Sequence, residues 1–339
     1  MFERILVPLD GSRLAEVVVL YATCLARGSG SEVILIHACS SEQEPYRHMH
    51  QVYLDHIAAS VRHQIRRCRP KSPEHKVQAI TMVGRPVDVI SNYVRNNSVT
   101  AVVMAASGGS GIKTWMLGSV VDKIVRTVNT PILLVEGNQA PSPRGKKKLI
   151  NRILLPLDGS DMSKIAVPYA RGLAKDLKAK ITLLGMAENA QYFSIHVSFI
   201  PYSNRTATAY RQMNLAAKSN VREYLARVEG ELKEEDVSVT CRITTGMSPA
   251  HDIIEQANKN NVDLIVMATR GKSPAYHLAF GSVAEKVLRG CKLPLLLVKE
   301  AERDRAIPSF VCQINNHREA ELRREAIPLH SNLGEPSDY

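Results

Sequence analysis

Two short motifs carry the residues of this chain that are best suited to chemistry, and each motif occurs twice. The first places an acidic side chain after an apolar run, as Pro8-Leu9-Asp10-Gly11-Ser12 and again as Pro156-Leu157-Asp158-Gly159-Ser160. A carboxylate in this position can accept hydrogen bonds from the donors of a sugar or a base. Asp and Ser also favour helix N-caps, so the alternative interpretation is that these aspartates, or the serines beside them, only cap the following helix.

The second motif combines a small residue at a strand end with a glycine loop and a glycine-serine pair. Its copies are Met104-Ala105-Ala106-Ser107-Gly108-Gly109-Ser110-Gly111 with Leu117-Gly118-Ser119, and Met267-Ala268-Thr269-Arg270-Gly271-Lys272-Ser273 with Phe280-Gly281-Ser282. The loop glycine permits backbone angles that larger residues avoid. A helix that begins at the glycine-serine pair offers unpaired N–H groups and a positive dipole end to a phosphate. Further charge could come from Lys113, Arg270 and Lys272.

The motifs need a scaffold that brings strand ends together, and the hydrophobic pattern supplies one. Short apolar runs predict strands over residues 5–9, 33–37, 77–83, 101–104 and 132–135, and again over 153–157, 181–184, 237–244, 263–267 and 295–298. Helical spacing lies between them, over residues 14–27, 54–68, 87–94 and 119–128 in the first half. Apolar strands that alternate with helices predict an α/β fold with a parallel sheet covered on both faces. Ligands bind such sheets beyond the carboxyl ends of the strands, where both motifs lie.

The order of these signals repeats along the 339 residues, which indicates a duplicated domain. The first motif returns after 148 residues (Asp10 to Asp158) and the second after 163 (Gly118 to Gly281), so the second copy contains an insertion, which we place within residues 192–211. The sequence predicts a first domain at residues 1–137 and a basic linker at 138–149. A second domain follows at 150–299, and then a charged tail at 300–339 that is partly ordered at best.

The two motifs together resemble the universal stress protein family, as a tandem of two such domains over about residues 1–136 and 150–299. The family signature is Gly-x2-Gly-x9-Gly-Ser/Thr after the fourth strand, with an aspartate after the first. The chain has Ala105-x2-Gly108-x9-Gly118-Ser119 and Ala268-x2-Gly271-x9-Gly281-Ser282, with alanine in place of the first glycine in both copies. The resemblance implies two tandem, doubly wound, Rossmann-like domains with five-stranded parallel sheets ordered 3-2-1-4-5. Strands one and four would then be neighbours, and both motifs would flank one crevice.

The resemblance also assigns residues to a nucleotide site in each half. Beside adenine and ribose it places Pro8, Asp10 and Ala38, and in the second half Pro156, Asp158 and Met186. On the phosphate side it places Met104, Ala105, Gly108, Gly118, Ser119 and Val120, and in the second half Met267, Ala268, Gly271, Gly281, Ser282 and Val283. Because Met186 is bulkier than Ala38, we expect the second pocket to be narrower at the base.

By this resemblance, the expected ligand is ATP or a related adenine nucleotide, with or without magnesium. The expected role is that of a nucleotide-dependent sensor or regulator in a cytoplasmic stress response. Two alternatives stay open: a dimerisation or scaffold protein without nucleotide, which the two alanines suggest, and a slow ATPase. The sequence shows no recognisable general base or arginine finger, so no catalytic residue is assigned.

Composition and the remaining motifs restrict other function classes. The formal charge is +11, which suits phosphate-bearing ligands, but aromatic residues make up only 5% and do not interleave with the basic runs, so we expect no nucleic-acid partner. The sequence contains no Walker phosphate loop and no apolar run of the roughly 18 residues that a membrane helix needs. Its six cysteines form no CxxC pair, as expected for a reduced cytoplasmic chain. Four histidines at positions 48, 50, 56 and 63 are expected on a solvated helix face and not at a metal.

The last predicted strand of each half would be a free apolar edge in an isolated domain. Exposed edges of this kind need to be covered. We therefore expect residues 132–135 and 295–298 to face each other within one chain, as an internal pseudo-dimer. A homodimer of the whole chain stays open.

Overall fold

The computed structural model describes residues 2–68, 76–106, 117–136, 148–187, 204–246, 248–271 and 280–300, without the side chains of residues 13–15, 68 and 204–207. All of these residues belong to one compact unit, Met1–Glu300. Several expectations concern residues outside this set: Gly108, Lys113 and Lys272 of the glycine loops, most of the linker, residues 192–203 of the insertion, and nearly all of the tail.

The first half alternates strands and helices in the order that the hydrophobic pattern predicts. Its strands are β1 (Arg4–Pro8), β2 (Glu32–Cys39), β3 (Val77–Val83), β4 (Ala101–Ala105) and β5 (Ile132–Val135). Its helices are α1 (Arg13–Ser29), α2 (Arg47–Cys68), α3 (Pro86–Asn96) and α4 (Ser119–Thr127). A short 3-10 helix that the sequence analysis did not predict, η1 (Ser41–Tyr46), begins with a capping box between Ser40 and Gln43.

The second half repeats this order. Its strands are β6 (Arg152–Leu157), β7 (Lys180–Met186), β8 (Val239–Thr244), β9 (Leu264–Ala268) and β10 (Leu295–Val298). Its helices are α5 (Asp161–Lys164), α6 (Val167–Leu177), α8 (Asn204–Lys233), α9 (Pro249–Lys259) and α10 (Ser282–Gly290). Helix α8 has 30 residues, whereas its counterpart α2 has 22. The described part of the expected insertion, residues 204–211, therefore belongs to this longer helix.

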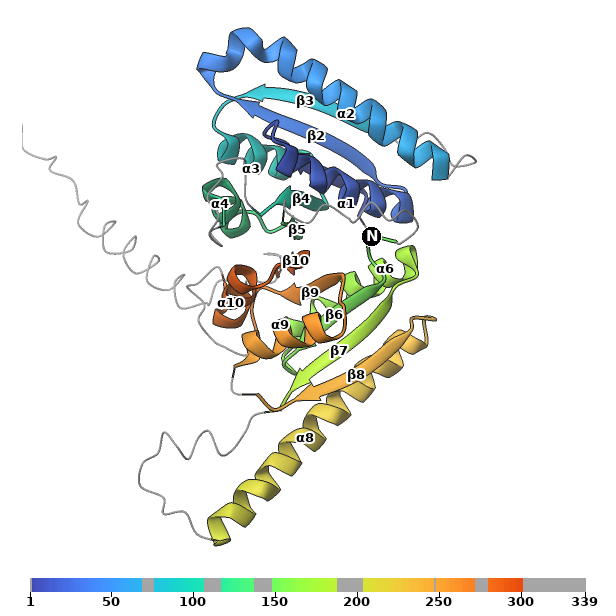
Figure 1. Cartoon of the computed structure of the whole chain (residues 1–339), viewed down its shortest axis with the longest axis vertical. Coiled ribbons are helices and arrows are strands. Elements are labelled where there is room, and N and C mark those ends of the chain that lie inside the picture. The colour runs from blue at the N-terminus through green and yellow to red at the C-terminus, as the bar shows by residue number, and fades with distance from the viewer. Residues whose placement is uncertain are drawn as a thin grey trace, which may run out of the picture. The chain divides into compact units, whose positions relative to one another are not determined.

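All ten strands form one sheet in the order β3-β2-β1-β4-β5-β10-β9-β6-β7-β8 (Figure 1). Within each half, neighbouring strands are parallel. Each half thus has the order 3-2-1-4-5, which confirms the predicted fold class. The order places the first and fourth strands of each half side by side.

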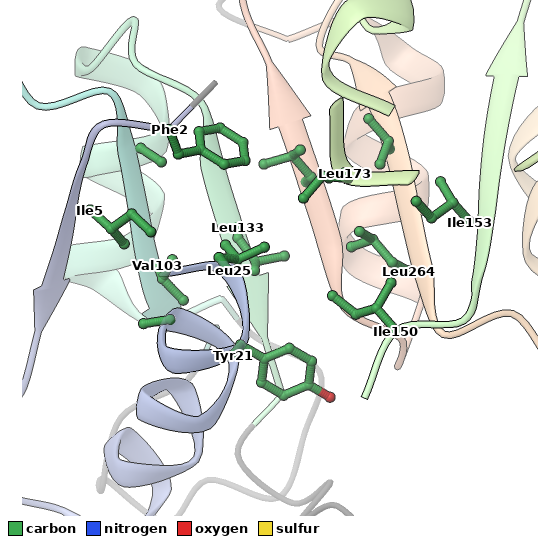
Figure 2. Close-up of a cluster of buried hydrophobic side chains, with 14 of the residues drawn as sticks. Phe2, Ile5, Tyr21, Leu25, Val103, Leu133, Ile150, Ile153, Leu173 and Leu264 are labelled. Atoms are coloured by element: carbon green, nitrogen blue, oxygen red, sulfur yellow. The ribbon is translucent and has the colours of Figure 1, made fainter. Parts of the chain in front are cut away.

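Two hydrophobic clusters hold helices on the two faces of this sheet. On one face, side chains of α1, α2, α6 and α8 pack in one cluster. Figure 2 shows Leu25 and Leu173, two of its members. On the other face, α3, α4, α9 and α10 pack in a second cluster that includes Val89 and Ile253. Burial of these apolar side chains is the main contribution to stability, at about 25 cal/mol for each Å² removed from water.

The two halves meet at β5 and β10, the only antiparallel pair among the described strands. Leu133 lies opposite Leu296 at the centre of this ladder. The two leucines hold equivalent positions in the repeat, so the ladder has an approximate twofold axis between them.

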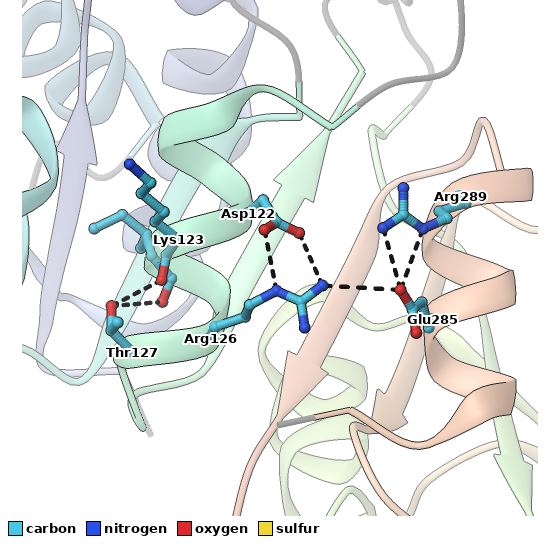
Figure 3. Close-up of polar contacts among 7 residues, drawn as sticks. Asp122, Lys123, Arg126, Thr127, Glu285 and Arg289 are labelled. Carbon is cyan, nitrogen blue, oxygen red and sulfur yellow. Dashed lines mark hydrogen bonds and ion pairs between the residues drawn. The ribbon is translucent and has the colours of Figure 1, made fainter. Parts of the chain in front are cut away.

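Side chains of α4 and α10 add contacts across this junction. Arg126 donates to Asp122 of its own helix, and its Nη2 lies 3.8 Å from Oε1 of Glu285 in α10 (Figure 3). The guanidinium carbon also lies 5.8 Å from the ring centre of Phe280. Arg126, Asp122 and Glu285 are partly exposed, so the ion pair adds little to the apolar ladder beneath it.

Candidate functional site

The two motifs of each half come together at the carboxyl edge of the sheet. Strand β1 pairs with β4, and β6 pairs with β9. Because parallel strands end at the same edge, the aspartate that follows β1 or β6 reaches the place where β4 or β9 ends. Ligands bind open α/β sheets at this point, where the strand order reverses.

Both aspartates form the same local turn. Oδ1 of Asp10 accepts from the Ser12 N–H at 2.9 Å, and Oδ1 of Asp158 accepts from the Ser160 N–H, also at 2.9 Å. The intervening glycine, Gly11 or Gly159, has a φ of +83°, a conformation that L side chains rarely adopt. The two halves therefore share the geometry of this turn as well as its amino-acid sequence.

The N-cap alternative applies to a serine in the second half. Ser160 caps α5, because its hydroxyl accepts from the Ser163 N–H at 3.1 Å. The same hydroxyl donates to Oδ1 of Asp158 at 2.6 Å. The aspartate is thus held by the capping residue and is not itself the cap.

The second oxygen of Asp158 lies against the glycine loop that follows β9. A methyl group built on Gly271 would lie 2.2 Å from Oδ2 of Asp158, so the carboxylate packs directly over the glycine Cα. The structure thus brings together two residues that are 113 positions apart (158 to 271). In the first half the matching glycine, Gly108, lies outside the described residues.

The glycine-serine pairs begin helices, as the sequence predicts. Gly118 and Gly281 occupy the N-cap positions of α4 and α10, and neither helix has a side-chain cap. The Gly118 N–H donates to Ala106 O at 3.0 Å, and the Gly281 N–H donates to Thr269 O at 2.7 Å. These bonds tie each helix start to the strand end before it. The N–H groups of the first turn, together with the exposed serine that follows each glycine, are the donors that a helix start of this kind offers to an anion.

The other predicted site residues divide into core and rim. Met104 and Met267 are 4% and 6% exposed and belong to the core below the strand ends. Ala105 packs against the cluster on the α1 face, and Ala268 is 6% exposed, so the methyl groups that replace the signature glycine are largely accommodated by the protein. Half-buried residues at the rim are Pro8, Ala38, Val120, Met186 and Val283, whereas Pro156 is buried.

The carboxyl ends of β2 and β7, where the family resemblance places the base of a nucleotide, differ more between the two halves than the sequence analysis indicated. In the first half, His37 of β2 is 6% exposed, stacks on His50 of α2 at 4.3 Å between ring centres, and shares a 2.8 Å hydrogen bond between Nδ1 and Leu9 O. Burial lowers the pKa of His37, and the charge of His50 lowers it further, whereas the Leu9 carbonyl and Asp10 raise it. In the second half the position of His37 is taken by Gly185, and a methyl group there would lie 2.4 Å from Val221 of α8.

Two buried polar residues of the second half, at the end of β8 and the start of α9, were missed by the sequence analysis. Asp252 is 8% exposed, and its Oδ2 is buried without a hydrogen-bond partner, as is Oγ1 of Thr244. In sequence both resemble ordinary surface residues of a helix start and a strand end. Only the packing of α9 on the sheet buries them.

Other site types find little support in the part of the chain that the structure describes. Within it, no group of three or more His, Cys, Asp or Glu side chains could hold a metal ion. None of its helices combines the length and the apolar character that a membrane crossing requires.

Comparisons with known proteins identify the family and the fold of the chain. The model of the Universal stress protein family matches residues 1–136 and 150–299. A universal stress protein of Methanocaldococcus jannaschii is 28% identical over 161 residues, which cover 48% of this chain and 89% of that protein. One from Mycobacterium tuberculosis is 23% identical over 318 residues and covers 88% of this chain and 96% of its own length. The crystal structure of a universal stress protein from Archaeoglobus fulgidus, 18% identical, covers 89% of this chain and 97% of that one with a TM-score of 0.60, which shows a shared fold.

Proposed function

The chain belongs to the universal stress protein family of stress-response proteins, and we propose that it binds ATP or a related adenine nucleotide and acts as a nucleotide-dependent sensor or regulator. The observation that carries the proposal is an arrangement present in both halves: a helix N-terminus without a side-chain cap is tied to one strand end, and an aspartate follows the neighbouring strand. A helix start of this kind favours a phosphate, and the carboxylate favours a hydroxyl or amino donor. A nucleotide offers both groups.

In this proposal each part of the nucleotide has a defined place. The first-turn N–H groups of α4 and α10 bind phosphate oxygens, and the hydroxyls of Ser119 and Ser282 add a donor. The carboxylates of Asp10 and Asp158 accept from the ribose hydroxyls. The base lies toward the ends of β2 and β7, next to Ala38 or Met186. Magnesium would enter as the counter-ion of the triphosphate.

Equilibrium binding of ATP to the full chain tests the proposal, with charge variants at the N-caps. Gly118→Asp and Gly281→Asp keep a good N-cap residue but place a negative charge where the phosphate would bind. Gly118→Ala and Gly281→Ala are the matched controls, because they add the same Cβ without the charge. We expect each Asp variant to lose ATP affinity in its own half by about tenfold or more relative to its Ala control. Equal ATP affinity in the Asp and Ala variants would show that the phosphate does not bind at the helix starts.

We also propose that the two halves act as an internal pseudo-dimer in the cytoplasm. The β5–β10 ladder supports this, because its centre relates equivalent leucines. The described cysteines, Cys24, Cys39, Cys241 and Cys291, are all free, which agrees with a reducing compartment. The same ladder would serve a scaffold without nucleotide, so the absence of ATP binding at millimolar concentration would favour that alternative.

A further inference from the structure

Two buried polar atoms in the second half lack a hydrogen-bond partner within the described structure. They are Oδ2 of Asp252, in the first turns of α9, and Oγ1 of Thr244, at the end of β8. Buried polar groups in folded proteins are nearly always hydrogen-bonded, and leaving one unpaired is costly. Two such atoms in one half therefore mark their surroundings as a candidate polar subsite.

The fold places both atoms in one corner of the sheet, beside the base end of the proposed site. Thr244 is the register partner of Met186, and its carbonyl accepts from the Ala187 N–H at 2.9 Å. Register partners in parallel strands point to the same face of the sheet, so Thr244 and Met186 both face α9 and α10. Gly246 comes two residues after Thr244, and the carboxylate of Asp252 packs over it. A methyl group built on Gly246 would lie 2.0 Å from Oδ2 of Asp252.

The first half has an apolar corner at the same place. Helices α3 and α9 both have 11 residues and both begin with proline, so Asp252 corresponds to Val89. Val89 is 6% exposed and packs over Gly84: a methyl group built on Gly84 would lie 3.0 Å from Cγ2 of Val89. The register partner of Ala38 is Met82, in the place of Thr244. The fold itself therefore does not need polar side chains in this corner.

The chemistry of the corner selects a hydrogen-bond donor. An ionised carboxylate only accepts, whereas a threonine hydroxyl both donates and accepts. Oδ1 of Asp252 lies 3.9 Å from Nδ1 of the largely exposed His251, too far for a hydrogen bond, and Oδ2 is the buried oxygen without a partner. The exocyclic amino group of adenine is a donor, and the ring nitrogens beside it are acceptors that can take the hydroxyl proton.

We propose that Asp252, assisted by Thr244, accepts a hydrogen bond from the amino group of adenine and is the specificity-determining residue of the second half. This inference rests on the proposed nucleotide site and adds to it a preference that the first half lacks. It assigns the two halves different tasks: the second discriminates between bases, and the first tolerates them.

The test measures binding in the Gly118→Asp background, where the second half is the remaining site. Two nucleotides are compared: ATP, and purine riboside triphosphate, which has the same ring without the amino group. We expect ATP to bind about 10- to 100-fold more tightly, as is typical for loss of a hydrogen bond to a charged group. In Asp252→Val, which copies the first half, the ratio of ATP affinity to purine riboside triphosphate affinity should fall to within about threefold of one. In Asp252→Asn this ratio should fall by a smaller factor. Thr244→Val should lower it less than Asp252→Val.

The ratio separates recognition from a structural role. If Asp252 only stabilised α9, its variants would lower the Tm and weaken both nucleotides equally, with the ratio unchanged, and the inference would be wrong. Equal binding of both nucleotides by the unsubstituted second half, or tighter binding of inosine triphosphate than of ATP, would also overturn it. If ATP binds in the Gly281→Asp background but not in the Gly118→Asp background, the inference fails while the proposed function stands. If ATP binds in neither background nor to the unsubstituted protein, both fail.

Discussion

At the scale of single residues, the second half shows how a strand-end carboxylate is oriented without serving as a helix cap. Ser160 caps α5 and also donates to one oxygen of Asp158, while the other oxygen packs over Gly271. The serine fixes the direction of the carboxylate, and the missing side chain of the glycine leaves room for it. The contact therefore depends on two sequence motifs at once.

Gly271→Ala should displace this carboxylate without unfolding the protein. The added methyl would lie 2.2 Å from Oδ2 of Asp158, which is the end of a side chain that can rotate away. In the Gly118→Asp background, we expect ATP affinity to fall about tenfold, the usual effect of losing one hydrogen bond to a charged group. Gly230→Ala is the control, because nothing lies within 4 Å of its added methyl; it should leave binding unchanged and raise stability by about 0.5–1 kcal/mol. Wild-type affinity in Gly271→Ala would show that the contact is irrelevant to the ligand.

His37 should make the stability of the protein depend on pH. Its pKa in the folded protein is lowered, chiefly by burial, from the ordinary value of 6.5. As the pH falls below about 6.5, the unfolded chain takes up a proton that the folded chain resists. The contribution of His37, fully present above that pH, is thus lost as the pH falls toward the folded pKa. We expect the drop in Tm between about pH 7.5 and pH 5.5 to be smaller in His37→Gln than in the wild type, and unchanged in His63→Gln, a substitution on the exposed face of α2.

Some residues of the site could be predicted from the sequence, and others could not. The aspartates and the glycine-serine pairs are recognisable because their chemistry follows from local geometry: a turn and a helix start. Asp252 and the His37–His50 pair have no local signature. Their surroundings arise from packing: His37 stacks on His50 of another element, and Asp252 is buried where α9 packs on the sheet.

At the scale of elements, helix α2 covers the free edge of the sheet as well as one of its faces. Strand β3 is an edge strand with one unpaired row of backbone groups. Arg47 and Arg62 of α2 donate to Thr81 O and Val77 O, at 2.9 and 2.7 Å. Gln51 donates to Ala79 O at 2.9 Å and accepts from the Thr81 N–H at 3.1 Å. Side chains thus occupy the positions that another strand would use, a protection against edge-to-edge association.

Gln51→Ala should therefore destabilise the protein more than the half-buried position of this polar side chain on a helix suggests. The substitution removes both partners that Gln51 gives to β3, and Thr81 is only 2% exposed, so its N–H cannot readily bind water. We expect the free energy of unfolding to fall by about 1–3 kcal/mol, measured by urea denaturation. Gln64→Ala on the same helix, where the side chain only reaches Ser60 at 3.4 Å, should change it by less than about 0.5 kcal/mol. Equal effects of the two substitutions would show that edge coverage contributes nothing.

The strands could be placed within two residues from the sequence because buried parallel strands read as continuous apolar runs. Other elements were less accessible. The 3-10 helix at Ser41–Tyr46 is polar, contains Pro45 and has no buried residue, so no hydrophobic period marks it. The start of α8 is similar: Met213 and Leu215 are 58% and 61% exposed, and the apolar stripe that normally marks a helix is weak there.

At the scale of the whole molecule, the junction between the halves has an approximate twofold axis. The ladder pairs Leu134 with Leu295, Leu133 with Leu296 and Ile132 with Leu297. Each residue thus meets the counterpart that twofold symmetry would assign. The same symmetry relates Asp122 and Arg126 of α4 to Glu285 and Arg289 of α10, which form matching pairs within their helices (Figure 3).

This symmetry predicts the behaviour of the first half alone. Residues 1–137 would lose β10, and the buried leucines of β5 would form an apolar free edge. Because the ladder is self-complementary about Leu133, a second copy can supply an equivalent β5, so we expect this fragment to be a dimer by light scattering after size-exclusion chromatography. Leu133→Lys should shift it toward monomer, since a charge at the centre of the interface would be buried without a partner. Gln64→Lys, a charge added far from β5, should leave it dimeric. A fragment that is monomeric and still folded, with the helix and strand content of the first half by circular dichroism, would show that the edge of β5 does not need a partner strand.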